Sequence, residues 1–323
     1  MIPRGGIFGI WIALVLAVWV LLFTRLVDFS FAAAHWFYPC IMVIGGFVAG
    51  ITPEGGGAVA FPVLSVFFEI DRATARDFSL MIQSVGMTSA SIYILTRPGT
   101  DPRKFLAVWW FVPVAFAGFV VGMIFLQNVP VFLLQALFLS LITTFTIAYI
   151  FAKHRGHRTD LGISGGYGSL VAVLLTGGLC TSLFGTGADI LIYTLLVTRF
   201  RVQEKTATQV SILLMAFLSM LGFAYRATVG TGLEVEQFQT WLLAAPVVLF
   251  MAPLGARLLV RIRIEWMLRG LALLNIAQLL YFNMKNPSWE KFSASVVFSA
   301  VLMTVFALAL DRLSPRRSML PEK

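Results

Sequence analysis

The chain has 323 residues, of which 59% are hydrophobic and only 12% charged, and its formal net charge is +9. Soluble domains average about 45–50% apolar and about 25% charged residues, so this composition excludes an ordinary soluble fold. The high hydrophobicity also excludes intrinsic disorder. We therefore expect an all-α polytopic membrane protein, one transmembrane domain over residues 1–323, whose basic residues collect in cytoplasmic loops rather than bind nucleic acid.

Apolar segments follow one another along the chain, most of them about 20 residues long, which is the length a helix needs to cross about 30 Å of hydrocarbon. The first resembles a secretory signal, but its apolar run exceeds the about 7–15 residues that such signals use. We expect a retained helix there. Eight segments are predicted to cross as single helices: 7–27, 78–96, 105–126, 130–151, 208–229, 238–260, 264–283 and 292–311.

Two further segments, 36–69 and 163–198, are long for one crossing and short for two. Glycines break each in the middle, at Gly55-Gly56-Gly57 and at Gly185-Thr186-Gly187. If both turn back as hairpins, the Lys and Arg residues outside the helices divide 17 to 6 between the two faces, whereas they divide 13 to 10 if both cross. The positive-inside rule favours the hairpins, with both termini in the cytoplasm.

The chain also resembles itself at an offset of 130–133 residues. Gly55 and Gly57 match Gly185 and Gly187, and later matches keep the same order: Tyr93 with Tyr225, Pro113 with Pro246, and Gly122 with Gly255. We predict internal repeats at about 36–151 and 163–283, with peripheral helices at about 7–27 and 292–311. Each repeat holds a hairpin and three crossings, so the second is inverted relative to the first, as in many secondary transporters.

The two glycine elbows are candidate substrate-binding elements. Glycine allows a positive φ and a close approach of the backbone, and the half-helix that starts after each elbow presents free amides and the positive end of its dipole to an anion. Other glycines, at Gly45-Gly46, Gly118 and Gly177-Gly178, are expected to allow only close helix packing. The predicted substrate-binding residues are Gly55, Gly56, Gly57, Gly185, Thr186, Gly187, Gln83, Ser84, Thr181 and Ser182.

Two acidic residues accompany the elbows, Glu54 before the first and Asp189 after the second. Ionisable groups inside a membrane are costly and are therefore functional candidates. Each acid could couple substrate movement to a proton, or could instead cap its half-helix. Near helix ends, Arg72, Arg76, Arg201 and Arg226 are expected to be solvated or close to lipid headgroups, and one of them could guide anions inward.

Other chemistry has little support in the sequence. Cys40 and Cys180 lie in apolar stretches without metal-ligand spacing, and His154 and His157 lie in a basic loop where solvation is the simpler interpretation. The glycine-rich run 162–168 lacks the strand and the Lys-Ser/Thr pair of a phosphate-binding loop. We expect no metal, no cofactor and no enzymatic activity.

The first elbow, Gly50-Ile-Thr-Pro-Glu-Gly-Gly-Gly-Ala-Val-Ala-Phe-Pro-Val-Leu64, resembles the glycine-triplet element of the TauE/SafE sulfite exporter family. The second elbow, Phe184-Gly-Thr-Gly-Ala-Asp-Ile-Leu191, is a degenerate copy. The resemblance implies a permease that moves sulfite, sulfonates or related sulfur anions across the bacterial inner membrane, often for export.

The leading hypothesis is a secondary transporter of sulfite or an organosulfonate, linked to protons and alternating access around the paired half-helix amino termini. Its partners would be the small anion, protons and membrane lipid, and the sequence leaves a homodimer open. Two other hypotheses are a passive anion channel and, with less support, an intramembrane enzyme that modifies lipids. Concentrative uptake driven by a pH gradient distinguishes a carrier from a channel.

Overall fold

A computed structural model describes residues 4–151, 158–159, 161, 166–229, 232–261 and 264–311. Its architecture is all-α, as the composition predicts, and the described residues contain only one isolated β-bridge, between Arg158 and Val202. His154, His157 and the first part of the glycine-rich run lie outside the described residues.

The chain enters the bundle through α1 (Arg4–Leu26) and a short α2 (Phe29–Ala34). The first long segment forms α3 (Phe37–Ile51) and α4 (Gly57–Pro62), which continues as the π-helical turn η1 (Val63–Phe67). The elements that follow are α5 (Arg72–Thr96), the 3₁₀ turn η2 (Pro102–Phe105), α6 (Val108–Phe125) and α7 (Val131–Ile150). The second long segment forms α8 (Tyr167–Phe184) and α9 (Ala188–Thr198), and the chain then continues through α10 (Glu204–Thr228), α11 (Val235–Leu259), α12 (Ile264–Met284) and α13 (Trp289–Asp311).

Eight helices in the described part of the chain are long and apolar enough to cross a membrane, which confirms a polytopic membrane protein. Seven of them correspond to segments predicted from the sequence to cross. The eighth is α8, which the sequence assigned to the second hairpin. The remaining predicted crossing, α12, has 21 residues and is not among these eight; it carries Arg269, Asn275, Gln278 and Asn283.

Both long segments turn back on themselves. The ring of Phe37, at the start of α3, stacks on that of Phe68, just after η1, with 4.1 Å between centroids. In the second segment, the amide of Arg158 donates to the carbonyl of Arg201 (2.9 Å) and the amide of Gln203 donates to that of Arg158 (2.7 Å). Each hairpin therefore ends on the face at which it began.

Each first arm of a hairpin packs against a long helix of the other half of the chain, α3 along α11 and α8 along α6. Glycines make both contacts close. A Cβ on Gly46 would touch Val248 of α11, a Cβ on Gly178 would collide with the backbone of Ala115 in α6, and a Cβ on Gly118 would collide with that of Leu175 in α8. These glycines serve helix packing, as expected from the sequence.

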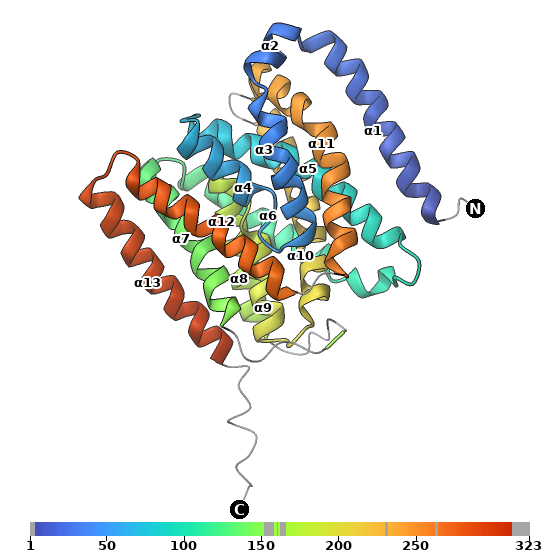
Figure 1. Ribbon diagram of the computed structural model, residues 1–323. Coiled ribbons are helices and arrows are strands. Elements are labelled where there is room, and N and C mark those ends of the chain that lie inside the picture. Colours follow the sequence, from blue (N-terminus) through green and yellow to red (C-terminus); the bar gives the residue numbers. More distant parts are fainter. Residues whose placement is uncertain are drawn as a thin grey trace, which may run out of the picture.

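The centre of the bundle is formed by α5 and α10, which pack against each other, with α11 against α5. The helices α1 and α13 lie at opposite edges of the bundle (Figure 1). Most of their residues face outward, although the Trp11 indole of α1 donates to Ser89 of α5 (2.8 Å) and that of Trp19 to the carbonyl of Leu242 (2.7 Å).

One expectation about charge is wrong. Helix α5 begins at Arg72 rather than at 78, and the side chains of Arg72 and Arg76 are buried instead of solvated, at 9% and 2% exposure. Arg76 is buried beside a buried carboxylate, that of Asp77, to which its Nε donates (2.8 Å), and Arg72 Nη2 donates to the carbonyl of Gln127 (2.8 Å). In a helix that crosses a membrane, charges of opposite sign can be buried when they pair with each other.

Candidate functional site

The two glycine elbows meet inside the bundle. Gly55 (φ 72°), Gly185 (φ 75°) and Gly187 (φ 120°) adopt the positive φ values that allow each chain to reverse. A Cβ on Gly57 would collide with Cβ and Cγ2 of Thr186, so that only glycine allows this contact. The Thr186 hydroxyl donates to the Glu54 carbonyl oxygen (3.2 Å), which joins the first elbow to the second.

The second elbow is capped by its own residues. Asp189 Oδ1 accepts the amides of Gly187 (2.9 Å) and Ile190 (3.1 Å), and the Thr181 hydroxyl accepts the amide of Ala188 (3.4 Å). The first amides of α9 therefore already have acceptors from the protein. This geometry fits the capping interpretation of Asp189.

The first elbow is open by comparison. Within the described part of the chain, the amides of Gly55, Gly56 and Gly57 make no short hydrogen bond to a protein acceptor beyond the weak turn over residues 53–56, although all three residues are buried. The amides at the start of α4 therefore remain available at the point where the two elbows touch. A small oxyanion is a suitable acceptor for such amides.

Glu54 is fully buried, and its carboxyl group is held by residues of α7 and α12. The hydroxyl of Thr146 in α7 donates to Oε1 (2.8 Å), and the Nδ2 of Asn275 in α12 lies 3.1 Å from Oε1 and 2.9 Å from Oε2. Neither partner was predicted from the sequence. Thr146 is one of several hydroxyl residues in α7, and Asn275 is one of several polar residues in α12, so nothing local singles either out as a partner of Glu54.

Gln83 projects from α5 toward both elbows. Its Nε2 donates to the carbonyl oxygens of Gly185 (2.7 Å) and Ser79 (3.0 Å), whereas its Oε1 is buried without a hydrogen-bond partner. A Cβ on Gly55 would collide with this Oε1, with the Thr186 hydroxyl and with Asp189 Oδ2, so these three oxygens converge beside Gly55.

Two predicted residues make their hydrogen bonds away from this convergence. The Ser84 hydroxyl donates to the carbonyl of Met81 in its own helix (2.7 Å). That of Ser182 donates to the carbonyl of Leu179 (2.7 Å) and lies against Gly122 of α6. Of the predicted residues, the structure thus brings together the two elbows, Glu54, Asp189, Gln83 and Thr181.

The site contains two buried carboxyl groups without a basic partner. Glu54 and Asp189 are both at 0% exposure, and no basic side chain in the described ranges forms an ion pair with either. The described residues also contain no group of three His, Cys, Asp or Glu residues that could hold a metal ion.

Two hairpins whose elbows meet within a bundle of long apolar helices define a polytopic membrane protein with the broken-helix arrangement of transporters. The chain belongs to the sulfite exporter TauE/SafE family, whose model matches residues 38–282. It is accordingly a multi-pass membrane protein of a family that transports sulfite and related sulfur anions. The comparisons with curated proteins and with solved structures found no match.

Proposed function

We propose that this protein is a proton-linked secondary carrier that moves sulfite or an organosulfonate across the bacterial inner membrane. The observation that carries the proposal is a pair of fully buried carboxyl groups, those of Glu54 and Asp189, at the junction where the Thr186 hydroxyl contacts the Glu54 backbone carbonyl and the Asp189 carboxyl oxygens. Two buried carboxyl groups in a site of low dielectric, without a cation, are far more stable when at least one of them holds a proton.

The proposed proton on Asp189 resides on Oδ2. Oδ1 already accepts two backbone amides, whereas Oδ2 has only the Thr186 hydroxyl nearby (3.2 Å). A proton on Oδ2 would give Asp189 a donor close to the unpartnered Oε1 of Gln83. The same proton removes a negative charge that would otherwise repel an anionic substrate.

Thr186 can act as the switch between the two elbows. Its hydroxyl has a single hydrogen, and three acceptors lie within 3.3 Å: the Glu54 carbonyl and the two carboxylate oxygens of Asp189. An ionised Asp189 attracts this hydrogen more strongly than a carbonyl does. Proton release from Asp189 would therefore weaken the link to the first elbow, and proton uptake would restore it.

The substrate would bind where the amides of Gly55, Gly56 and Gly57 meet Thr186 and Gln83, with Gly185 and Gly187 shaping the opposite wall. The positive end of the α4 dipole and free amides stabilise an oxyanion without a formal positive charge. Thr181 would keep the second elbow in position by capping α9.

Alternating access would come from rocking of the two inverted repeats, 36–151 and 163–283. Backbone geometry at the ends of the hairpins supports this division at an offset of 132 residues. Glu69 (φ 56°) and Arg201 (φ 53°) both have left-handed conformations. The amides of Phe68 and Phe200 bond the carbonyls of Val63 and Leu195, and those of Ile70 and Val202 bond Leu64 and Leu196.

Orientation follows from the distribution of charge. With both hairpins turning back, the positive-inside rule favours cytoplasmic termini. In this orientation the first hairpin enters from outside and the second from the cytoplasm.

Flux into proteoliposomes tests the proposal. An imposed pH gradient should drive concentrative uptake of sulfite by the wild-type protein and by Asp28→Asn, which changes an exposed acid. Asp189→Asn should abolish this pH-driven accumulation because Asn cannot release the coupling proton. Accumulation by Asp189→Asn equal to that of Asp28→Asn would refute proton coupling at Asp189, and purely downhill flux in the wild-type protein would instead favour the channel.

A further inference from the structure

A second group of polar side chains lies between α5, α10 and the α6–α7 loop. We call it the arginine cluster, and it consists of Arg72, Arg76, Asp77, Gln127 and Arg226. Asp77 accepts hydrogen bonds from Arg76 Nε (2.8 Å) and from Arg226 Nε and Nη2 (3.1 Å each). Arg76 Nη1 donates to Gln127 Oε1, and Arg72 Nη2 donates to the Gln127 carbonyl (2.8 Å).

The arginine cluster holds more positive charge than it can neutralise internally. Three guanidinium groups lie beside a single buried carboxylate, that of Asp77, which bonds Arg76 and Arg226 but not Arg72, and the other acid nearby, Asp71, is exposed and uses its side chain to cap α5. Arg72 forms no ion pair in the described residues, and its Nη1 is buried without a hydrogen-bond partner. A buried cation with an unused donor is costly unless an anion pairs with it.

The position of the cluster connects it to the elbows. Arg76 and Gln83 are seven residues apart on α5, which is about two helical turns or 10 Å along one face. The carbonyl of Arg76 would collide with a Cβ on Gly185, and Gln127 Nε2 lies 3.4 Å from the carbonyl oxygen of Ser182. The arginine cluster therefore begins directly beside the second elbow.

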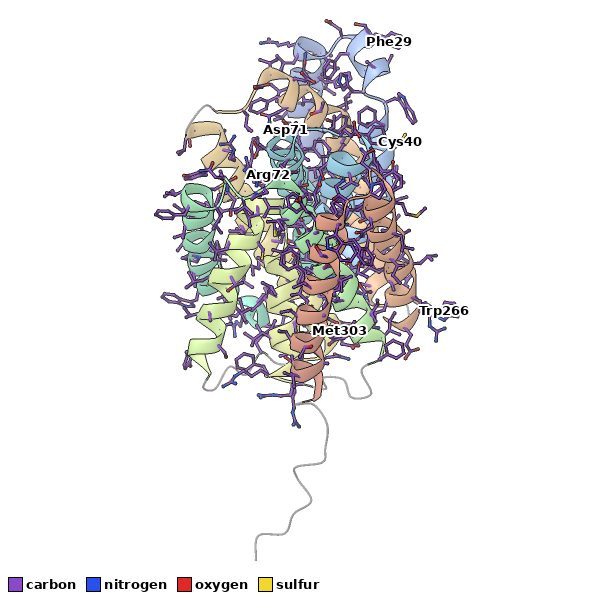
Figure 2. The ribbon with its side chains drawn as sticks, turned by 90° about the vertical axis from the view of Figure 1, so that its left-hand side faces the viewer. Phe29, Cys40, Asp71, Arg72, Trp266 and Met303 are labelled. Carbon is purple, nitrogen blue, oxygen red and sulfur yellow. The ribbon has the colours of Figure 1, made fainter. Side chains whose placement is uncertain are left out.

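The position of Arg72 in the bundle indicates toward which face of the protein the arginine cluster lies. Figure 2 shows Asp71 and Arg72 toward the end of the molecule that carries Phe29, whereas Trp266 and Met303 lie toward the opposite end. In the proposed orientation, the Phe29 end is the outer face. An anion that leaves the elbows outward would next meet the guanidinium groups.

We propose that Arg72, Arg76 and Arg226 form a second anion-binding site, between the elbows and the outer face, for a small oxyanion such as sulfite or a sulfonate headgroup. Guanidinium groups present planar pairs of donors that match two oxygens of such an anion, which an ammonium group does not. The inference rests on the proposed function, because the arginine cluster would be a second binding site for the transported anion. Its immediate donors are Arg72 Nη1, which is free, and the shared guanidinium groups around Asp77.

Isothermal titration of the full-length protein in detergent with sodium sulfite tests the site. The wild-type protein and Arg25→Gln, a control at the exposed end of α1, should show two binding events. Arg72→Gln should retain one event and weaken the other at least about tenfold, because a charged hydrogen bond is lost. Gly57→Ala, which fills the contact with Thr186, should remove the event that Arg72→Gln retains.

The outcomes separate the two proposals. A single event in the wild-type protein that Gly57→Ala removes and Arg72→Gln leaves unchanged would overturn the second site and leave the proposed function standing. No binding in any variant would overturn both. Arg72 forms no ion pair with Asp77, so Arg72→Gln is expected to fold. If the Arg72→Gln protein is not monodisperse in size-exclusion chromatography, Arg72→Lys is titrated in its place. A sulfite affinity of Arg72→Lys equal to that of the wild-type protein would overturn the guanidinium site.

Discussion

Thr186→Val is the substitution that tests the junction of the two elbows most directly. Valine keeps the branched shape of threonine, so Cβ and the methyl group that contact Gly57 remain, and only the hydroxyl is lost. The Glu54 carbonyl then loses its donor from the second elbow, and Asp189 loses its one side-chain donor. Both acceptors are buried, so no bulk water replaces the hydroxyl.

The expected magnitude follows from these contacts. A hydrogen bond to a charged group is worth about 1.5–3 kcal/mol, and a neutral one about 0.5–1.5 kcal/mol. If the bridge exists in one access state only, its loss shifts the equilibrium between the states by about twofold if the neutral bond is lost and by up to about 150-fold if the charged one is. The pH-driven rate of sulfite uptake should fall by a similar factor, since the carrier would spend most of its time in one state.

The assay compares initial uptake rates in proteoliposomes for Thr186→Val and for Thr176→Val. Thr176 lies on an exposed face of α8, where its hydroxyl bonds only to the carbonyl of Ala172 in the same helix (2.8 Å). Thr176→Val should transport like the wild-type protein. Equal uptake by the two variants, at equal incorporation into the liposomes, would refute the role of Thr186 as a switch.

Two further predictions concern stability and are measured by thermal unfolding in detergent. Asn275→Leu should lower the melting temperature, because Glu54 loses its amide donor at a cost of about 1–3 kcal/mol. The double variant with Glu54→Leu should recover part of this loss, because the buried carboxyl group is then also removed. A double variant that recovers nothing would contradict the pairing of Glu54 with Asn275. Gly178→Ala should also destabilise the protein, by about 1–3 kcal/mol, because the new methyl group would collide with the backbone of Ala115. The control Gly168→Ala has open space around its new methyl group and should leave the melting temperature unchanged. Equal melting temperatures of the two variants would contradict the close packing of α6 and α8.

The hairpins were predictable because they depend on properties that are local in the chain. A segment of about 35 apolar residues with glycines at its centre can satisfy its backbone hydrogen bonds as two shorter helices that turn back. The residues of the two elbows could also be predicted, since Gly55, Gly185 and Gly187 have the positive φ for which glycine is suited.

The partners across the bundle were not predictable in the same way. The ion pair between Asp77 and Arg226 joins residues 149 positions apart, and the bond between Glu54 and Asn275 spans 221 positions. No local pattern contains such a pairing. For the same reason the start of α5 was placed too late: Arg72 looks like a loop residue until its neighbours from other helices are known.

The residues that carry the proposed mechanism all lie within the part of the chain that the family model matches. Residues 38–282 include both elbows, Gln83, the arginine cluster and the partners of Glu54 on α7 and α12. The two long helices outside the match, α1 and α13, are also those with the smallest buried share among the helices that could span the membrane. Helix α1 reaches the bundle through the Trp11 and Trp19 indoles, which bond Ser89 of α5 and the Leu242 carbonyl of α11 rather than the elbows.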